Sequence, residues 1–231
     1  TKTVGGSFTV KGNLTNGTNN ILADGGFTIT LNGNSTMTGT NTGSGKILFS
    51  GGTSAHSVAG TGSYNNLELD DINGITQSAT INIGGTLTLT SGTFTLSSSS
   101  LTITGTTTLN STLIFSSTSG TKTFGTIIIN TGGLMSFSAA SALTVNGDLT
   151  LNGTGAISGT TGTWTFQKVG GGTISAASST LTIAGATTFS TSYTLPTTYT
   201  VNTLSVGTGA AITNAGTVTV NTALSGLGSF V

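Results

Sequence analysis

The residues that could carry out acid–base chemistry are few and lie close together in the sequence. His56 is the only histidine, and Glu68, Asp70 and Asp71 form the only acidic cluster. A hydrolase with a serine, a histidine and a carboxylate would have to use His56 as its base. Serine is abundant throughout the chain, so a serine near His56 is not by itself evidence of a nucleophile. We therefore expect His56 to be a polar residue at a turn or on a coil face.

The acidic cluster has three readings. Carboxylate oxygens suit calcium, but the Gly-Gly-x-Gly-x-Asp repeat of calcium-binding solenoids is missing. Glycoside hydrolysis needs two acids across a cleft, whereas Glu68 and Asp70 alternate to the same face of a strand. We expect a solvated strand end, and we predict no catalytic residue, no metal ligand and no cofactor; a cysteine-ligated metal is excluded because the chain has no cysteine.

Three further sequence features could bind or carry a ligand. Gly170–Gly172 lacks the Lys-Ser/Thr pair and the helix of a phosphate-binding loop, so it is interpreted as a turn. Alternating threonines such as Thr86, Thr88 and Thr90 could bind ice on a flat face, but threonine is also the usual outward residue of a strand. Asn-x-Ser/Thr sequons make five asparagines candidate glycan acceptors if the secreting organism glycosylates: Asn13, Asn16, Asn34, Asn110 and Asn152.

Composition excludes several partners. Only 4% of the 231 residues are charged, against about 25% in typical domains. Nucleic-acid binding needs clustered Lys and Arg, and the five basic residues here are scattered, so no nucleic-acid partner is predicted. No stretch approaches the ~18 apolar residues of a membrane helix, so no membrane insertion is expected. The chain starts at Thr1 without a signal peptide, which fits a processed chain or a segment of a longer one.

The dominant pattern along the chain is an alternation of apolar residues with Thr, Ser or Asn in short runs. Leu87–Leu89, Leu101–Ile103 and Leu143–Val145 are examples. Such alternation predicts strands with one apolar and one polar face. Strand starts recur at about 20 residues, a period typical of solenoids and too short for propeller blades. The sequence therefore predicts an all-β fold, a single-stranded parallel β-solenoid of about 20 residues and three strands per coil, continuous over residues 1–231.

A recurring local motif supports short coils. The pattern apolar-x-apolar-x-Gly-x-x-x-apolar occurs at Ile81–Leu89, Leu101–Leu109, Leu143–Leu151 and Leu181–Phe189. Two strands joined at a glycine corner fit this spacing. The main alternative is an antiparallel β-sandwich of the pilin type, which also has many short strands. Spacings of six to eight residues between strands are tight for hairpins, and they favour the solenoid.

A longer motif carries a resemblance to known proteins. It has an aromatic residue, a Gly/Ser turn and an apolar residue eight or nine positions later, as in Phe49–Val58 and Phe115–Phe124. A degraded copy is Trp164–Ile174, in which Ile174 lies eight positions after Phe166. These blocks resemble the Gly/Thr-rich repeats of large secreted surface proteins of Bacteroidetes, and the whole chain is more loosely similar to autotransporter passengers and filamentous-haemagglutinin-like adhesins. In that pattern a glutamine often stands where His56 and Lys122 stand here. The resemblance implies a secreted protein at the cell surface and carries over no catalytic residue.

The function expected from these observations is structural. A solenoid exposes an unpaired strand edge at each end unless a cap covers it. The terminal segments look strand-like and uncapped, and their apolar residues are the predicted assembly edges that would join copies of the chain head to tail: Phe8, Val10, Val218, Val220, Leu227, Phe230 and Val231. We expect a non-enzymatic subunit or segment of an extracellular filament, sheath or adhesin stalk.

The alternative function is a glycan-binding adhesin module, with surface glycans as partners. Its sugar-stacking candidates are Tyr64, Trp164, Tyr193 and Tyr199, because aromatic rings combine an apolar face with a polar tip. Trp164 shares a strand face with Phe166, so it is expected to fill the core instead.

Overall fold

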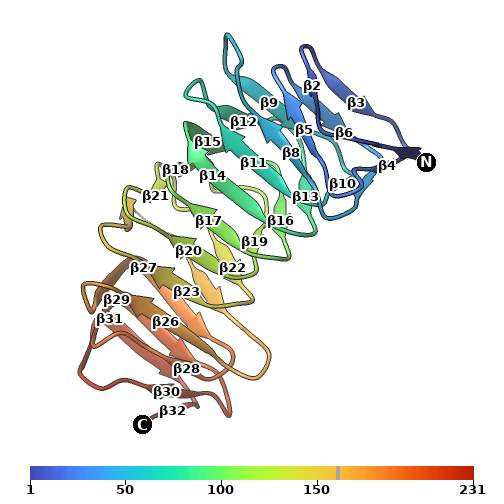
Figure 1. Cartoon of the computed structure of the whole chain (residues 1–231). Coiled ribbons are helices and arrows are strands. Elements are labelled where there is room, and N and C mark those ends of the chain that lie inside the picture. Colours follow the sequence, from blue (N-terminus) through green and yellow to red (C-terminus); the bar gives the residue numbers. More distant parts are fainter. Residues whose placement is uncertain (160–161) are drawn as a thin grey trace.

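The chain is a parallel β-solenoid of about 11 turns with roughly 20 residues per turn. The computed structural model describes residues 1–159 and 162–231. It forms an elongated rod with the two termini at opposite ends (Figure 1). Within the described ranges, no helix is long and apolar enough to span a bilayer.

Three sheets, here named A, B and C, form the rod, and the chain visits them in that order in most coils. Sheets A and B run the whole length of the rod, whereas the last described strand of sheet C ends at Gly159. Sheet A contains β1 Lys2–Thr3, β4 Ile21–Ala23, β7 Thr40–Thr42, β10 Ser63–Tyr64, β13 Ile81–Ile83, β16 Leu101–Ile103, β19 Lys122–Phe124, β22 Leu143–Val145, β25 Trp164–Phe166, β27 Thr180–Phe189, β29 Thr198–Val206 and β31 Thr217–Gly226. Sheet B contains β2 Phe8–Val10, β5 Thr28–Leu31, β8 Lys46–Phe49, β11 Leu67–Asp70, β14 Leu87–Ser91, β17 Thr107–Leu109, β20 Ile127–Ile129, β23 Leu149–Leu151, β26 Gly172–Ala176, β28 Tyr193–Thr194, β30 Ala211–Thr213 and β32 Ser229–Phe230. Sheet C contains β3 Leu14–Asn16, β6 Ser35–Met37, β9 His56–Ala59, β12 Ile75–Gln77, β15 Thr93–Leu96, β18 Thr112–Phe115, β21 Leu134–Phe137 and β24 Ala156–Gly159.

The register of the sheets confirms the predicted coil. Leu67 pairs with Leu87, Leu87 with Thr107 and Thr107 with Ile127, so these three steps along sheet B are 20 residues each. All the strand pairings among the described residues are parallel, as in Leu101 with Lys122. The antiparallel pilin-type sandwich is therefore the wrong alternative: short polar corners return the chain to the next coil rather than to a hairpin partner.

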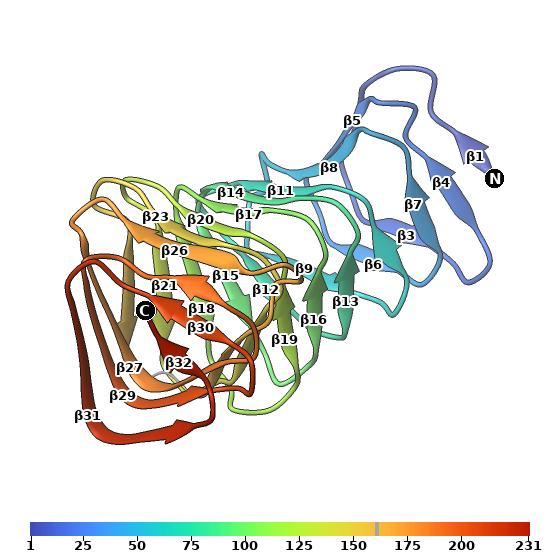
Figure 2. The ribbon, with the colours of Figure 1, turned by 90° about the horizontal axis from the view of Figure 1, so that it is seen from below.

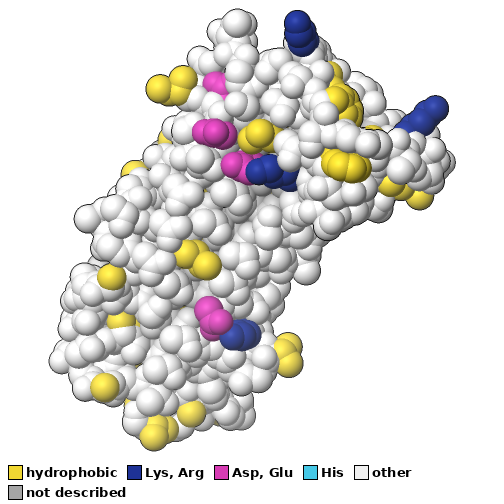
Figure 3. Space-filling view, viewed as in Figure 1, with side chains coloured by type: hydrophobic (Ala, Val, Ile, Leu, Met, Phe, Trp, Pro, Cys, Tyr) yellow, Lys and Arg dark blue, Asp and Glu magenta, His cyan; other side chains and the backbone are white. Residues whose placement is uncertain are grey.

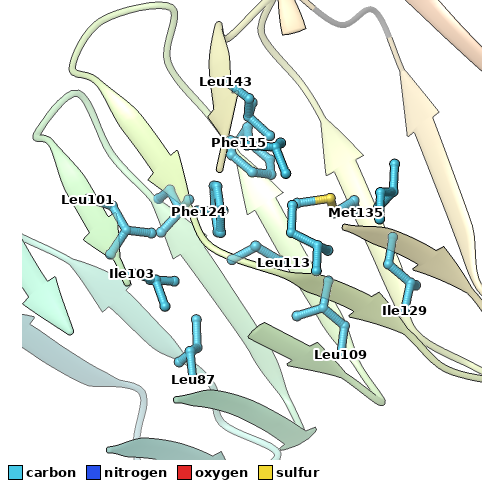
Figure 4. Close-up of a cluster of buried hydrophobic side chains, with 14 of the residues drawn as sticks. Leu87, Leu101, Ile103, Leu109, Leu113, Phe115, Phe124, Ile129, Met135 and Leu143 are labelled. Atoms are coloured by element: carbon cyan, nitrogen blue, oxygen red, sulfur yellow. The ribbon is translucent and has the colours of Figure 1, made fainter. Parts of the chain in front are cut away.

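The alternating sequence places one side-chain set inside each coil. In β16, Leu101 and Ile103 are buried while Thr102 between them is only half-buried. Seen from below, the strands of the three sheets wind around a common interior (Figure 2), and apolar side chains from all three sheets meet there (Figure 4). Each fully buried Leu or Ile contributes about 1.5–3 kcal/mol, so a stack of coils can be stable without charged interactions.

Glycine at the corner between sheets A and B allows successive coils to approach closely. A Cβ on Gly105 would lie 2.3 Å from the carbonyl oxygen of Gly85, and one on Gly125 would lie 2.3 Å from that of Gly105. Three copies of the predicted glycine motif make this corner. The fourth, Leu181–Phe189, lies within the single strand β27, which shows a register shift between Ile183 and Ala186 instead of a break.

The interior changes character along the rod. In the first coils it contains polar groups: Asp24 is fully buried and accepts hydrogen bonds from the N–H groups of Gly26 (2.9 Å) and Gly45 (2.7 Å) and from Asn41 Nδ2 (3.1 Å). In the C-terminal half aromatic rings take over, beginning with Phe115, which stacks on Phe137 at 4.3 Å between ring centroids. The first coils therefore bury hydrogen-bonded polar groups beside their apolar core, whereas contacts between aromatic rings are concentrated in the C-terminal half.

The core position of Thr107 is predicted to lower the stability of the solenoid. Thr107 is fully buried in the column of Leu87 and Ile127, and its hydroxyl has no hydrogen-bond partner among the described residues. An unsatisfied buried hydroxyl costs about 1–3 kcal/mol, so Thr107→Val should raise the free energy of unfolding by ~1 kcal/mol. Chemical denaturation measures the gain; Thr108→Val, on the outer face of the same strand, is the control and should leave stability within about 0.5 kcal/mol. Equal or lower stability of Thr107→Val would contradict the prediction.

Candidate assembly edges and polar sites

The first coil presents an open strand edge. Strand β2 pairs with β5 on one side, through Phe8 with Ile29 and Val10 with Leu31. No described strand pairs with its other side. Phe8 is 44% exposed, and Val10 is half-buried. Two of the predicted edge residues therefore lie on the N-terminal face, where apolar side chains meet unpaired backbone.

The last coil presents the opposite edge. Strand β31 pairs only with β29, and β32 pairs only with β30, among the described strands. Leu227 is 83% exposed, Phe230 47% and Val231 77%, whereas Val218 and Val220 are half-buried. All five predicted C-terminal edge residues thus lie on this coil, and nothing in the described chain covers it.

The four aromatic residues considered for sugar stacking lie inside the solenoid. Tyr64, Trp164 and Tyr199 are 0% exposed and Tyr193 is 2% exposed. The tyrosine hydroxyls bond internally; Tyr64 donates to Ser35 Oγ (2.9 Å), and burial raises the pKa of the Tyr64 phenol. The prediction that Trp164 fills the core is confirmed, and the role proposed for the three tyrosines is wrong because alternation turns them to the inner face.

His56 is also inside, which corrects the expectation of a residue at a turn or coil face. It is 2% exposed, and its ring packs against Phe49 at 5.2 Å between centroids. Its Nδ1 lies 2.8 Å from the carbonyl oxygen of Gly33, and its Nε2 lies 3.0 Å from Asp71 Oδ2. Asp71 is likewise buried rather than part of a solvated strand end.

The Asp71 carboxylate is held by donors from two coils. Besides His56, it accepts hydrogen bonds from the N–H groups of Gly52 (2.6 Å) and Asn73 (2.9 Å) and from Asn73 Nδ2 (2.9 Å). Burial alone would raise the pKa of Asp71, but the donors from Asn73, His56 and Gly52 outweigh it and lower the pKa from 3.8 to about 2. The pair cannot serve as a hydrolytic dyad in this arrangement, because both ring nitrogens are engaged and the ring is shielded from solvent.

Glu68 and Asp70 do lie on the outer face of sheet B, as predicted. Glu68 accepts from Lys46 Nζ at 2.5 Å and from Thr90 Oγ1 at 2.9 Å. Asp70 accepts from Ser91 Oγ at 2.8 Å. Figure 3 shows only a few acidic and basic side chains on the face that it presents, with white surface over much of the rest. In the described part of the chain, no group of three His, Cys, Asp or Glu side chains could hold a metal ion.

Lys122 is a buried cation that sequence reasoning did not single out as a core residue. It is 2% exposed on the inner side of β19. Its Nζ donates to the carbonyl oxygens of Ser99 (2.6 Å), Ser119 (3.1 Å) and Gly120 (3.3 Å), all in corners between sheets C and A. Burial lowers the pKa of Lys122, while the three carbonyl acceptors match the three donors of an ammonium.

The glycine run is a turn, as predicted. Gly170 and Gly171 have φ values of 83° and 90°, and the Gly171 N–H donates to the carbonyl of Lys168 at 3.0 Å. The turn lines a shallow hollow of about 310 Å³ beside Tyr193. Lys168 forms an ion pair with Asp148 at 2.7 Å, so its charge is neutralised locally.

The sequons differ in accessibility. Asn13, Asn34, Asn110 and Asn152 are exposed. Asn16 is only 8% exposed, and its Nδ2 donates to the carbonyl of Thr40 at 3.2 Å, so the folded coil leaves no room for a glycan there. Glycosylation at the four exposed positions stays a prediction.

Sheet A carries an outward row of threonines, which the sequence analysis did not identify. The row consists of Thr102, Thr123, Thr144, Thr165 and Thr188, each the register partner of the next. The signal for it was the central residue of each apolar-Thr-apolar triplet at the coil period. By contrast, Thr90 of the threonine group singled out earlier bonds to a charged group on sheet B.

Comparisons with protein-family models, with curated proteins and with solved structures found no match to this chain. The solenoid architecture therefore rests on the pairings described above.

Proposed function

We propose that the chain is a structural part of an extracellular surface filament, sheath or adhesin stalk, which extends when copies stack head to tail through the two open coils. The observation that carries this proposal is the pair of uncovered end faces. Phe8 lies on one face, and Leu227 and Phe230 lie on the other, each beside unpaired strand edges. Backbone groups in an open edge form hydrogen bonds with any strand that meets them in register.

Two of the three sheets offer matching edges at the two ends. Sheets A and B are parallel and reach both ends of the rod, so β31 and β32 of one copy and β1 and β2 of another present strands of matching direction, whereas the described strands of sheet C end at β24. Stacking in this way is heterologous, because different surfaces meet, and such contacts propagate into fibres. Burying the exposed Leu227 side chain and its neighbours would add the apolar driving force.

The outer wall is consistent with a passive stalk. Two ion pairs lie on the wall, Lys46 with Glu68 on sheet B and Lys168 with Asp148 at corners between sheets A and B. With formal net charge zero, stacked copies would experience little long-range repulsion. The resemblance of the Gly/Thr-rich blocks to secreted surface repeats supports an extracellular location as part of the same proposal.

Charges placed on the end faces test the proposal. The double variant Phe8→Asp/Leu227→Asp would bring carboxylates together in an apolar junction, where desolvation makes them unfavourable. We expect wild-type protein of native length at micromolar concentration to form rods many times longer than one chain in electron micrographs, and the double variant to remain monomeric in sedimentation velocity.

The matched control is Val169→Asp, since Val169 is 95% exposed but lies in a corner away from both end faces. This variant should assemble like the wild type. Dispersed wild-type monomers, or fibres that form equally well from the double variant, would overturn assembly through these edges.

A further inference from the structure

We propose that the His56–Asp71 pair is a pH-sensitive clasp, which holds the loop of residues 50–55 against the solenoid wall and releases it when the imidazolium loses a proton. This inference is independent of head-to-tail assembly, because it concerns one corner between sheets B and C.

The hydrogen bonds around the ring require its charged form. Nδ1 lies 2.8 Å from the Gly33 carbonyl oxygen, which can only accept. Nε2 lies 3.0 Å from Asp71 Oδ2, and this carboxylate already accepts from Gly52 and Asn73, as an anion would. Only an imidazolium donates from both nitrogens. A neutral ring would leave one lone pair facing an acceptor in a buried site.

The pair fastens an otherwise exposed loop. Loop residues Gly51, Thr53, Ser54 and Ala55 are exposed, whereas Gly52 lies against the wall. The Gly52 N–H donates to Asp71 Oδ2 at 2.6 Å, and its carbonyl accepts from Asn73 Nδ2 at 2.9 Å. A Cβ on Gly52 would lie 2.5 Å from His56 Cε1, so the loop backbone rests directly on the imidazole. Movement of the ring or of Asp71 is therefore transmitted to the loop.

Few other charges can influence the ring. Lys46 on β8 pairs with Glu68 on β11 on the outer wall, and Asp70 also points outward. The side chain of Tyr64 on β10 also points inward, and its hydroxyl donates a hydrogen bond to Ser35 Oγ. Strands β9 and β12 and the corner containing Gly33 contribute no other titratable residue. Asp71 is thus the one charge, among the described residues, that bonds to His56.

The low-pH limit of the clasp follows from Asp71. Its hydrogen bonds lower its pKa from 3.8 to about 2. A carboxyl whose pKa is lower in the folded state stabilises that state above its ordinary pKa, and the contribution is lost as the pH falls through the lowered value. The clasp should therefore be closed above about pH 4 and open as the pH falls toward about 2.

Because the chain has one histidine, proton NMR of the imidazole reports its titration without ambiguity. On the full chain, the experiment also measures the hydrogen-exchange rate of the Gly52 amide at each pH of that NMR series. Each rate is corrected for the pH dependence of intrinsic amide exchange. Loss of one charge-assisted hydrogen bond corresponds to about a tenfold or larger fall in protection. We expect that fall at the same midpoint as the His56 signal, while the Gly125 amide, which donates to Ile103 O at 2.8 Å in another coil, stays protected.

The variant His56→Gln supplies the control, since glutamine has no proton to lose in this range. Its Gly52 protection should not change where the wild-type histidine titrates. A wild-type loop whose protection is constant through the titration, a fall that persists in His56→Gln, or an equal fall at Gly125 would each overturn the clasp, the last because the whole solenoid would be responding.

Discussion

Replacing Trp164 with alanine is expected to lower the free energy of unfolding by about 3–5 kcal/mol, the loss typical of a large aromatic removed from a packed core. Trp164 is fully buried and lies 5.8 Å from Phe137 and 5.9 Å from Phe166 between ring centroids. It links rings of sheet C in one coil with rings of sheet A in the next. The cavity would therefore interrupt the aromatic column rather than a single contact. Denaturant unfolding followed by circular dichroism measures the loss.

Two matched variants make this prediction specific. Trp164→Phe keeps an aromatic ring and should lose less than half as much stability, and Thr165→Ala, on the outer face of the same strand, should change it by less than about 0.5 kcal/mol. In a solenoid, each coil is stabilised mainly by its neighbours, so the alanine variant should also broaden the transition. Equal unfolding midpoints for the alanine and phenylalanine variants would show that the ring column does not act as a continuous core.

The coil itself could be predicted from the sequence because its signal is periodic. Apolar residues at alternate positions identify the inner face of a strand, and a 20-residue recurrence identifies the coil. The structure places Leu67 and Leu87 in register as that recurrence requires. The same alternation predicted Trp164 inside. Parallel rather than antiparallel pairing followed from corners too short for the hairpins of a sandwich, a constraint that also comes from spacing.

The polar core residues could not be predicted because residue type and position conflict. His, Asp and Lys are residue types that usually lie on the surface. Their polarity therefore predicted exposed positions for His56, Asp71 and Lys122, whereas the structure buries all three. Only the folded corner shows what resolves the conflict, namely backbone carbonyls and N–H groups from adjacent coils, such as Gly33 O for His56. The prediction of Tyr64 as an exposed sugar-stacking residue failed for the same reason, because its hydroxyl donates a hydrogen bond to Ser35 inside the solenoid.

Similar sequence blocks also turned out to occupy different places in the coil. Phe49–Val58 spans the corner from sheet B to sheet C, Phe115–Phe124 spans C to A, and Trp164–Ile174 spans A to B. The motif therefore encodes a turn between two inward-facing residues, which any corner can use. Its copies are not structurally equivalent, so the shared glutamine position of the resembling repeats does not define one site in this solenoid.

Replacing Lys122 with methionine is expected to lower the free energy of unfolding by about 3 kcal/mol. The ammonium donates to the carbonyls of Ser99, Ser119 and Gly120. Methionine fills similar apolar space without a donor, so these carbonyls would lose their partner, at ~1–3 kcal/mol for each acceptor left buried. Relief from burying a charge offsets part of that loss. Thermal and denaturant unfolding measure the difference.

Glutamine at the same position separates hydrogen bonding from packing. Glutamine and methionine are both one atom shorter than lysine, but the glutamine amide supplies two N–H donors. Lys122→Gln should therefore recover at least half of the stability that Lys122→Met loses. Should both variants lose the same amount, the contribution of Lys122 would lie in its aliphatic stem; should Lys122→Met be more stable than the wild type, burial of the charge would outweigh its three hydrogen bonds. Recovery by glutamine alone would show that backbone carbonyls at a coil corner require a donor and not a charge, and this would explain how different polar side chains can occupy the interior of one repeating fold.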